Sequence, residues 1–204
     1  MARPSVALRC SPLVWVTAIL GLLLSTAAQA QSHFDVTPVA EKRVSQLPPG
    51  PLFWRIDTFP TLAEAHAVAS STALAAEVAG KVWLFTLGPS GGSSPGGNKV
   101  AEIGPVPSFA ASEYLLRINW AGGPPGAKTP VHTHPGVETF YVLSGNLTQK
   151  MPDGAHRVSA GQSMPGHSPN TPMQVSSSGV SDLSVLVMFV TDATKPFSSP
   201  ATMP

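Results

Sequence analysis

Glycine and proline divide this chain into short segments, and this spacing limits the folds that the chain can adopt. The sequence contains 22 prolines and 18 glycines, with short apolar stretches between them. A proline ends or kinks a helix and a glycine destabilises one, so long helices are disfavoured and short strands joined by turns are favoured. We therefore expect an all-β domain, a sandwich or a barrel, rather than a sheet of alternating strands and helices.

The segments between the turns predict the strands and one helix. Thr61-Leu62-Ala63-Glu64 fits a capping box and predicts a short helix that ends near Ala69. Gly88–Asn98 has too few apolar side chains to pack and is expected to be a flexible loop. The expected strands are Leu52–Thr58, Ala73–Val78, Lys81–Leu87 (a hairpin with the preceding strand, turning at Ala79-Gly80), Val100–Val106, Tyr114–Trp120, Glu138–Leu143, Leu147–Met151, His156–Val158, Met173–Ser176 and Leu183–Val190.

The first 30 residues have the layout of an export signal. Arg3 and Arg9 precede an apolar run at 13–24, and Ala28-Gln29-Ala30 fits the pattern before a cleavage site. We expect cleavage before Gln31 and a periplasmic or secreted protein of bacterial type. An uncleaved membrane anchor is the alternative, but the run is shorter than the roughly 20 residues that span a bilayer.

The remaining chain is expected to form one domain. Residues 31–50 show little periodicity and predict an N-terminal arm, residues 51–195 predict the β-barrel domain, and residues 196–204 predict a proline-rich C-terminal tail. The single cysteine, Cys10, lies in the expected signal, so any metal must be bound by nitrogen and oxygen. The formal net charge is +1 and there is no basic run, so nucleic acid and anionic membranes are not expected partners.

One stretch, at 126–145, carries a candidate metal site. His132 and His134 are two residues apart, so both side chains leave the same face of an extended strand, and Glu138 keeps the even spacing. Gly136 adds no side chain that would fill the space between them. Two imidazoles and one carboxylate on one side of an ion form a facial triad, which is typical of catalytic divalent metals. Paired histidines can also be ordinary surface or core residues, and the carboxylate at matching spacing favours the metal site.

The same stretch resembles the first motif of the cupin superfamily. Gly126, His132, His134, Glu138 and Gly145 fall on the defining positions of this motif. The resemblance implies a single jelly-roll β-barrel with one divalent metal ion inside it, and iron, manganese, nickel, copper and zinc all occur in the family. It also implies a possible homodimer formed through edge strands, for which the apolar segment 183–190 is a candidate unless it is an inner strand.

The second cupin motif, which normally supplies another histidine ligand, is degraded at 161–175. Met173 stands where that histidine is expected, and His167 lies six residues earlier. Three interpretations stay open: His167 is the fourth ligand, Met173 is a thioether ligand suited to copper(I), or there is no fourth protein ligand and Met173 lines the cavity. Phe140 shares the spacing of Glu138 and is expected inside the barrel near the metal.

These features support two hypotheses about function. The first is a metal-dependent enzyme, oxygenase-like or isomerase-like, that acts on a small organic molecule, with Glu138 as a metal ligand that could also carry a proton. The second is a non-catalytic barrel that holds a metal or binds a small ligand. An open coordination position would favour the enzyme, and a closed set of four protein ligands would favour the second hypothesis.

Overall fold

The computed structural model describes Met1 and residues 32–204. The expected export signal, with Cys10 and the cleavage site before Gln31, therefore lies outside the described residues. No helix in the described part of the chain is long and apolar enough to cross a membrane. Antiparallel strands dominate this part, and the expectation of an all-β fold with one short helix is confirmed.

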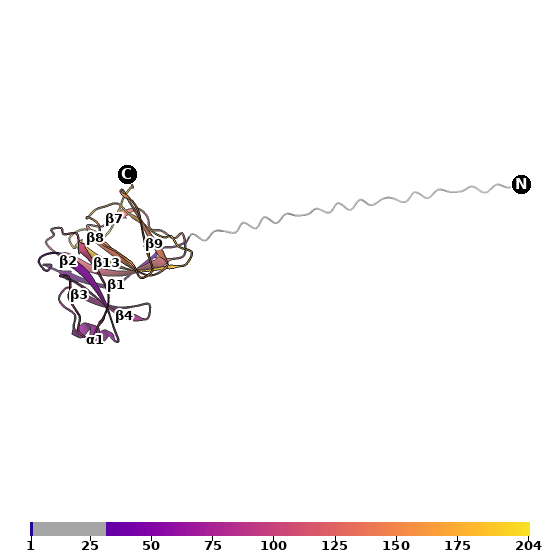
Figure 1. The fold of residues 1–204 in the computed structure, drawn as a ribbon. Coiled ribbons are helices and arrows are strands. Elements are labelled where there is room, and N and C mark those ends of the chain that lie inside the picture. The colour runs from indigo at the N-terminus through magenta and orange to yellow at the C-terminus, as the bar shows by residue number, and fades with distance from the viewer. Residues whose placement is uncertain (2–31) are drawn as a thin grey trace. The chain divides into compact units, whose positions relative to one another are not determined.

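A five-stranded sheet lies at the centre of the described structure (Figure 1). Its middle strand is β13, so the segment 183–190 is an inner strand with no free edge for pairing with a second copy of the chain. In order across the sheet, the strands are β1 (Asp35–Val44), β6 (Tyr114–Gly123), β13 (Leu183–Asp192), β8 (Gly136–Ser144) and β11 (Ser163–Met164).

Strand β13 is buried on both faces, which explains its nearly continuous apolar sequence. Successive side chains of a strand point to opposite faces, so a strand that is covered on both sides needs apolar residues at every position. Met188 and Val190 belong to the hydrophobic cluster on one face of the central sheet. Val187 and Phe189 belong to the cluster on the other face.

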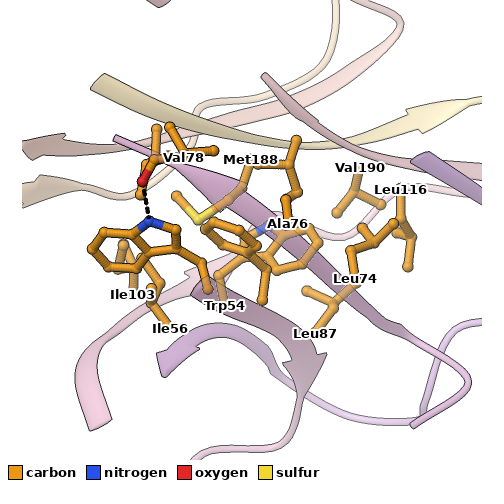
Figure 2. Packing of buried hydrophobic residues seen from close by; sticks show 14 of the residues in the cluster. Trp54, Ile56, Leu74, Ala76, Val78, Leu87, Ile103, Leu116, Met188 and Val190 are labelled. Carbon is orange, nitrogen blue, oxygen red and sulfur yellow. Dashed lines mark hydrogen bonds between the residues drawn. The ribbon is translucent and has the colours of Figure 1, made fainter. Parts of the chain in front are cut away.

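A four-stranded sheet covers the first of these faces. Figure 2 shows Met188 and Val190 packed among side chains of this second sheet, including Trp54 and Leu74. Its strands, in order, are β3 (Ala73–Val78), β4 (Lys81–Gly88), β2 (Leu52–Phe59) and β5 (Asn98–Val106). The two sheets enclose a core that contributes no residue to the cavity described below.

The local predictions for this second sheet are confirmed. The hairpin between β3 and β4 turns at Ala79 and Gly80, which both have positive φ, 51° and 70°. Helix α1 (Leu62–Ala67) contacts β3 and β4, as Figure 1 shows. Its N-cap is Thr61, whose Oγ1 accepts a hydrogen bond from the backbone N–H of Glu64 at 3.2 Å.

Smaller sheets face the other side of the central sheet and complete the barrel. Strands β10 (Gly154–Ser159), β9 (Asn146–Met151) and β12 (Gln174–Ser177) form a three-stranded sheet, and β7 (His132–Thr133) pairs with β14 (Ser199–Pro200). Leu147 and Val175 from the three-stranded sheet pack with Val185 and Val187 of β13. The candidate site lies in this half of the structure.

The N-terminal arm expected at 31–50 is corrected by the structure. Residues 35–44 form β1, an edge strand that pairs antiparallel with β6, so Leu52–Thr58 is not the first ordered strand. A register shift between Pro38 and Ala40 interrupts the two-residue period in this strand. Proline is tolerated on an edge strand, where its missing N–H is not needed by a neighbour.

The glycine-rich loop at 88–98 is tied to the four-stranded sheet, although its composition predicts a flexible loop. Ser94 is buried and donates to Oδ2 of Asp57 at 2.8 Å, and the guanidinium of Arg55 donates to both, at 3.1 Å in each case. Polar contacts thus hold a loop that has few apolar side chains. A buried carboxylate and a buried guanidinium stabilise each other only when they are paired in this way.

Candidate metal centre

The structure brings His132, His134 and Glu138 together at the ends of two strands. One ligand atom from each residue lies within 4.8 Å of the corresponding atoms of the other two. His134 and Glu138 are each only 4% exposed, and His132 is half-buried. His132 begins β7 and Glu138 lies in β8, so the even spacing of the three residues survives the bend at Pro135-Gly136.

Gly136 has a different role from the one that its place in the motif suggests. A Cβ atom there would lie 2.1 Å from the carbonyl oxygen of Val190 and 2.5 Å from the Cα of Thr191. Glycine is therefore needed because β8 and β13 approach each other closely at this point, where Gly136 pairs with Thr191. This close approach fixes the start of β8, and through it the position of Glu138.

Both histidines present the same ring nitrogen to the site. Nδ1 of His132 lies 2.9 Å from the carbonyl oxygen of Pro130, and Nδ1 of His134 lies 2.6 Å from that of Phe197. A carbonyl oxygen can only accept a hydrogen bond, so each Nδ1 carries the proton and each Nε2 keeps a free lone pair. This tautomer is the one that a metal ion requires when Nε2 is the ligand.

Glu138 is buried, and no cationic side chain at 32–204 pairs with it. Its contact in the site is the side-chain amide of Gln149, whose Nε2 lies 3.4 Å from Oε2 of Glu138. Burial removes water from the carboxylate and raises the pKa of Glu138 from 4.5 to about 8. A positive charge placed among the three ligand atoms would offset this cost.

Burial acts in the opposite direction on the histidines of the site. The pKa of His134 falls from 6.5 to about 4, chiefly because desolvation disfavours the imidazolium. Burial likewise lowers the pKa of His167. Both rings are therefore neutral at pH 7, which is the state that ligates a metal.

The second-motif residues lie beside the three-residue group without joining it. Nε2 of His167 is 3.2 Å from Nε2 of Gln149, and Sδ of Met173 is 3.2 Å from the same amide nitrogen. Met173 also exchanges backbone hydrogen bonds with His132 at 2.9 and 3.0 Å. A fourth protein ligand from His167 or Met173 therefore stays a prediction, and Gln149 is the residue that separates them from Glu138.

A cavity of about 360 Å³ opens beside the candidate ligands, and all three of them line it. Phe140 lines it as well, and Met173 is not among its lining residues. Most of the wall is apolar and comes from β13, β12, β1 with the residue before it, and the C-terminal segment: Val185, Val187, Phe189, Val175, Val36, Phe34, Phe197 and Pro200.

Asn119 is a polar residue of this wall that sequence analysis did not single out. It is 1% exposed, and its Oδ1 accepts a hydrogen bond from Nε of Arg117 at 2.9 Å. Arginine only donates, so the amide oxygen must face Arg117 and the amide nitrogen is left for the cavity. No side chain at 32–204 accepts a hydrogen bond from this nitrogen.

The donor set fits a divalent metal ion. Two imidazoles whose Nε2 lone pairs are free and one buried carboxylate that has no counter-charge among residues 32–204 are ligands suited to iron, nickel, copper or zinc. All three groups come from one side, so other coordination positions face the cavity. The arrangement is that of a β-rich fold with a His-His-Glu group that could hold a metal ion.

The comparison with protein families agrees with this class. Residues 122–189 match the family model described as Cupin domain, so this part of the chain is a cupin domain. The matched residues include the three candidate ligands together with β6, β8, β9 and most of β13. No curated protein is significantly similar to this chain.

Several solved cupin structures resemble parts of this chain. The lyase DddQ, a DMSP lyase from Ruegeria pomeroyi DSS-3, is 21% identical over 42% of this chain and 43% of its own, with a TM-score of 0.37. The polyketide cyclase RemF from Streptomyces resistomycificus is 19% identical over 44% and 62%, with a TM-score of 0.37. An oxalate oxidase in complex with glycolate is 20% identical over 41% and 45%, with a TM-score of 0.36. This chain spans less than two thirds of each of these proteins, and such partial likenesses carry no functional argument.

Proposed function

We propose that this protein binds one divalent metal ion through His132, His134 and Glu138 and acts as a metal-dependent enzyme on a small organic molecule. The observation that carries this proposal is that all three candidate ligands line one cavity with a largely apolar wall. A bound divalent ion would polarise an oxygen atom of the molecule that it coordinates. The chemistry that we favour is oxygenase-like, with an isomerase-like reaction as the next choice.

The cavity limits the molecule that can bind. Its volume of about 360 Å³ lies near the lower end of the range of ligand sites, roughly 300–1,000 Å³. Phe140, Val187 and Phe189 would contact an apolar body such as a single ring. The free amide nitrogen of Asn119 would donate a hydrogen bond to an oxygen of the same molecule. We therefore propose a small, mainly apolar substrate with at least one hydrogen-bond acceptor.

The residues of the site would perform distinct tasks. His132 and His134 would hold the metal in a fixed orientation because backbone carbonyls restrain both rings. Glu138, with a pKa raised to about 8, would bind the ion as a carboxylate and take up a proton if it detached. The apolar wall would exclude water from the bound substrate.

A non-catalytic binding protein is the second candidate. It is favoured by the scarcity of titratable groups on the wall of the cavity, where the only ones are the three candidate ligands themselves. Such a protein would hold the metal and the ligand without converting it. We also propose that the protein is exported to the periplasm or beyond, on the basis of the pattern in its first 30 residues.

Metal content and thermal stability test this proposal. Protein purified without an affinity metal should contain close to one divalent ion per chain by elemental analysis, and Glu138→Ala should contain much less. Added metal should raise the melting temperature at pH 8. When free metal is in hundredfold excess over the Kd, binding adds about 2.7 kcal/mol to the free energy of unfolding. The rise should be much smaller at pH 5, where protons compete for the ligands.

Two histidine variants provide the control. His132→Ala should abolish the effect of metal, whereas His156→Ala should retain it because His156 contacts Asp153 on the surface. An equal response to metal in the wild type and in His132→Ala would place the ion elsewhere. Turnover of a candidate aromatic or enolic compound by the metal-loaded protein would separate the enzyme from the binding protein.

A further inference from the structure

The C-terminal segment 196–201, which the sequence predicts to be a tail, returns to the candidate metal centre. Ser199 and Pro200 form β14, which pairs with Thr133 and His132 of β7. The backbone N–H of Ala201 donates to the carbonyl oxygen of Val131 at 3.1 Å. The segment is thus attached to β7, the strand that contains His132 and immediately precedes His134.

We propose that this segment is a positioning strap for the metal centre, in which the carbonyl of Phe197 fixes the ligating nitrogen of His134. The proposal rests on the proposed metal-binding function. It assigns the orientation of a candidate ligand to residues outside the His132–Glu138 stretch. The hydrogen bond from Nδ1 of His134 to the carbonyl oxygen of Phe197 is 2.6 Å long and joins residues 63 positions apart.

The ring of Phe197 holds this carbonyl in place. It packs against the rings of His134 and Phe189, with centroids 4.8 and 4.9 Å away, and those two rings also contact each other at 4.9 Å. The guanidinium of Arg117 lies 4.3 Å from the centre of the same ring. Arg117 is in turn held by Asn119 at 2.9 Å and lies 3.6 Å from Glu41 of β1. These contacts hold the residue whose carbonyl bonds to His134 next to the imidazole.

His132 provides an internal comparison. Its Nδ1 is held by the carbonyl of Pro130, two residues away in the same segment. Loss of the strap would leave this hydrogen bond in place while His134 lost its own. The strap therefore orients one imidazole of the pair. Loss of the group that accepts a hydrogen bond from a ligating histidine typically lowers metal affinity 10- to 100-fold.

A pair of truncations tests the strap in the otherwise complete chain. Removal of residues 196–204 deletes Phe197 and β14, whereas removal of residues 202–204 leaves Ala201 and the paired segment. We expect the first truncation to bind cobalt(II) about 10- to 100-fold more weakly than the wild type, and the second to bind it equally. In the metal-free proteins, nitrogen-15 NMR reports which ring nitrogen of each histidine carries the proton. The proton of His134 should lie on Nδ1 in the wild type and in the chain that lacks only residues 202–204, but not in the chain that lacks 196–204. The tautomer of His132 should be the same in all three proteins.

Point variants keep the test decisive if the longer truncation does not fold. Ala201→Pro removes the N–H that bonds to Val131, and Ala201→Ser retains it. Ala201→Pro should weaken cobalt binding, and the proton of His134 should no longer be confined to Nδ1. Ala201→Ser should change neither property. Unchanged affinity and an unchanged tautomer in Ala201→Pro would overturn the proposal, and so would the same result in the longer truncation where it folds. If the wild type bound no metal, the proposed function would fail, and the tautomer of His134 in the metal-free chain would still decide the role of the strap.

Discussion

The side-chain amide of Gln149 lies 3.4 Å from Oε2 of Glu138, and no cation contacts this buried carboxyl group among the residues at 32–204. Gln149 is itself fully buried, and its Oε1 has no hydrogen-bond partner in this part of the chain. A buried carboxyl group beside an uncharged amide keeps its proton to a higher pH than one in water. The metal-free protein should therefore respond to pH through Glu138.

The stability of the metal-free protein should fall as the pH rises from 6.5 to 8. In this range the folded state keeps a proton on Glu138, with its pKa of about 8, which the unfolded chain has already released. His134, with a pKa lowered to about 4, is neutral in both states above pH 6.5. Rising pH then favours unfolding by about 1.4 kcal/mol per pH unit, or about 2 kcal/mol in all.

Below pH 6.5 a second effect opposes this decline. The unfolded state binds protons on its histidines, whereas burial keeps His134 and His167 neutral in the folded state. Between about pH 4.5 and 6.5 these histidines offset the proton that Glu138 holds in the folded state, so stability should change much less with pH there than above pH 6.5. Urea unfolding at several pH values measures this curve. Glu138→Gln should lack the decline, while the exposed Glu77→Gln should keep it, and a decline of equal size in Glu138→Gln would refute the assignment.

Metal binding should release about one proton at pH 7. Glu138 is protonated in the metal-free site and must lose its proton to ligate, whereas His134 is already neutral. Calorimetric titration with zinc in two buffers of different ionisation enthalpy gives the number of protons released. The number should fall toward zero at pH 9. Release of a full proton at pH 9 would mean that a group other than Glu138 supplies it.

Local sequence patterns predicted that the three candidate ligands lie close together because they fall within seven consecutive residues. The alternation of side chains along a strand is a local property, and it carried His132, His134 and Glu138 to one side of the structure. The longer strands from residue 52 onward were predicted for the same reason, since each shows its own apolar pattern between turn residues, whereas the two-residue strands β7, β11 and β14 were not. Strand β1 was missed because its register shift and exposed edge position obscure that pattern.

The residues that surround the ligands could not be predicted in this way. Phe197 reaches His134 only through the tertiary fold, and nothing in its proline-rich surroundings indicates a buried contact. Asn119 lies in an apolar strand and belongs to no motif. Its role depends on which neighbour donates a hydrogen bond to its amide oxygen. A buried asparagine on an inward-facing position of a predicted strand is the signal that could have found it.

Gly136→Ala should destabilise the protein strongly. The added methyl group would lie 2.1 Å from the carbonyl oxygen of Val190, so β8 and β13 would have to separate, at a cost of about 3 kcal/mol. Gly88→Ala is a matched control, because Gly88 also lies in a strand and no atom is within 4 Å of the added group. Chemical unfolding measures both. Equal stability of the two variants would show that the close approach of β8 and β13 does not require glycine.

Asn119→Leu should remove the preference of the cavity for a ligand oxygen. In the wild type, Arg117 holds the amide oxygen and leaves Nδ2 to donate to the ligand. A net hydrogen bond contributes about 1 kcal/mol, or about fivefold in affinity.

This preference can be measured with two aromatic carboxylates that differ only by a ring hydroxyl group. Each compound is titrated into the metal-loaded protein, and the two Kd values are compared. The ratio of their Kd values should approach one in Asn119→Leu, whereas Asn98→Leu, at an exposed position of β5, should keep the ratio of the wild type. If the wild-type ratio persists in Asn119→Leu, the oxygen of the ligand is recognised by another group of the cavity.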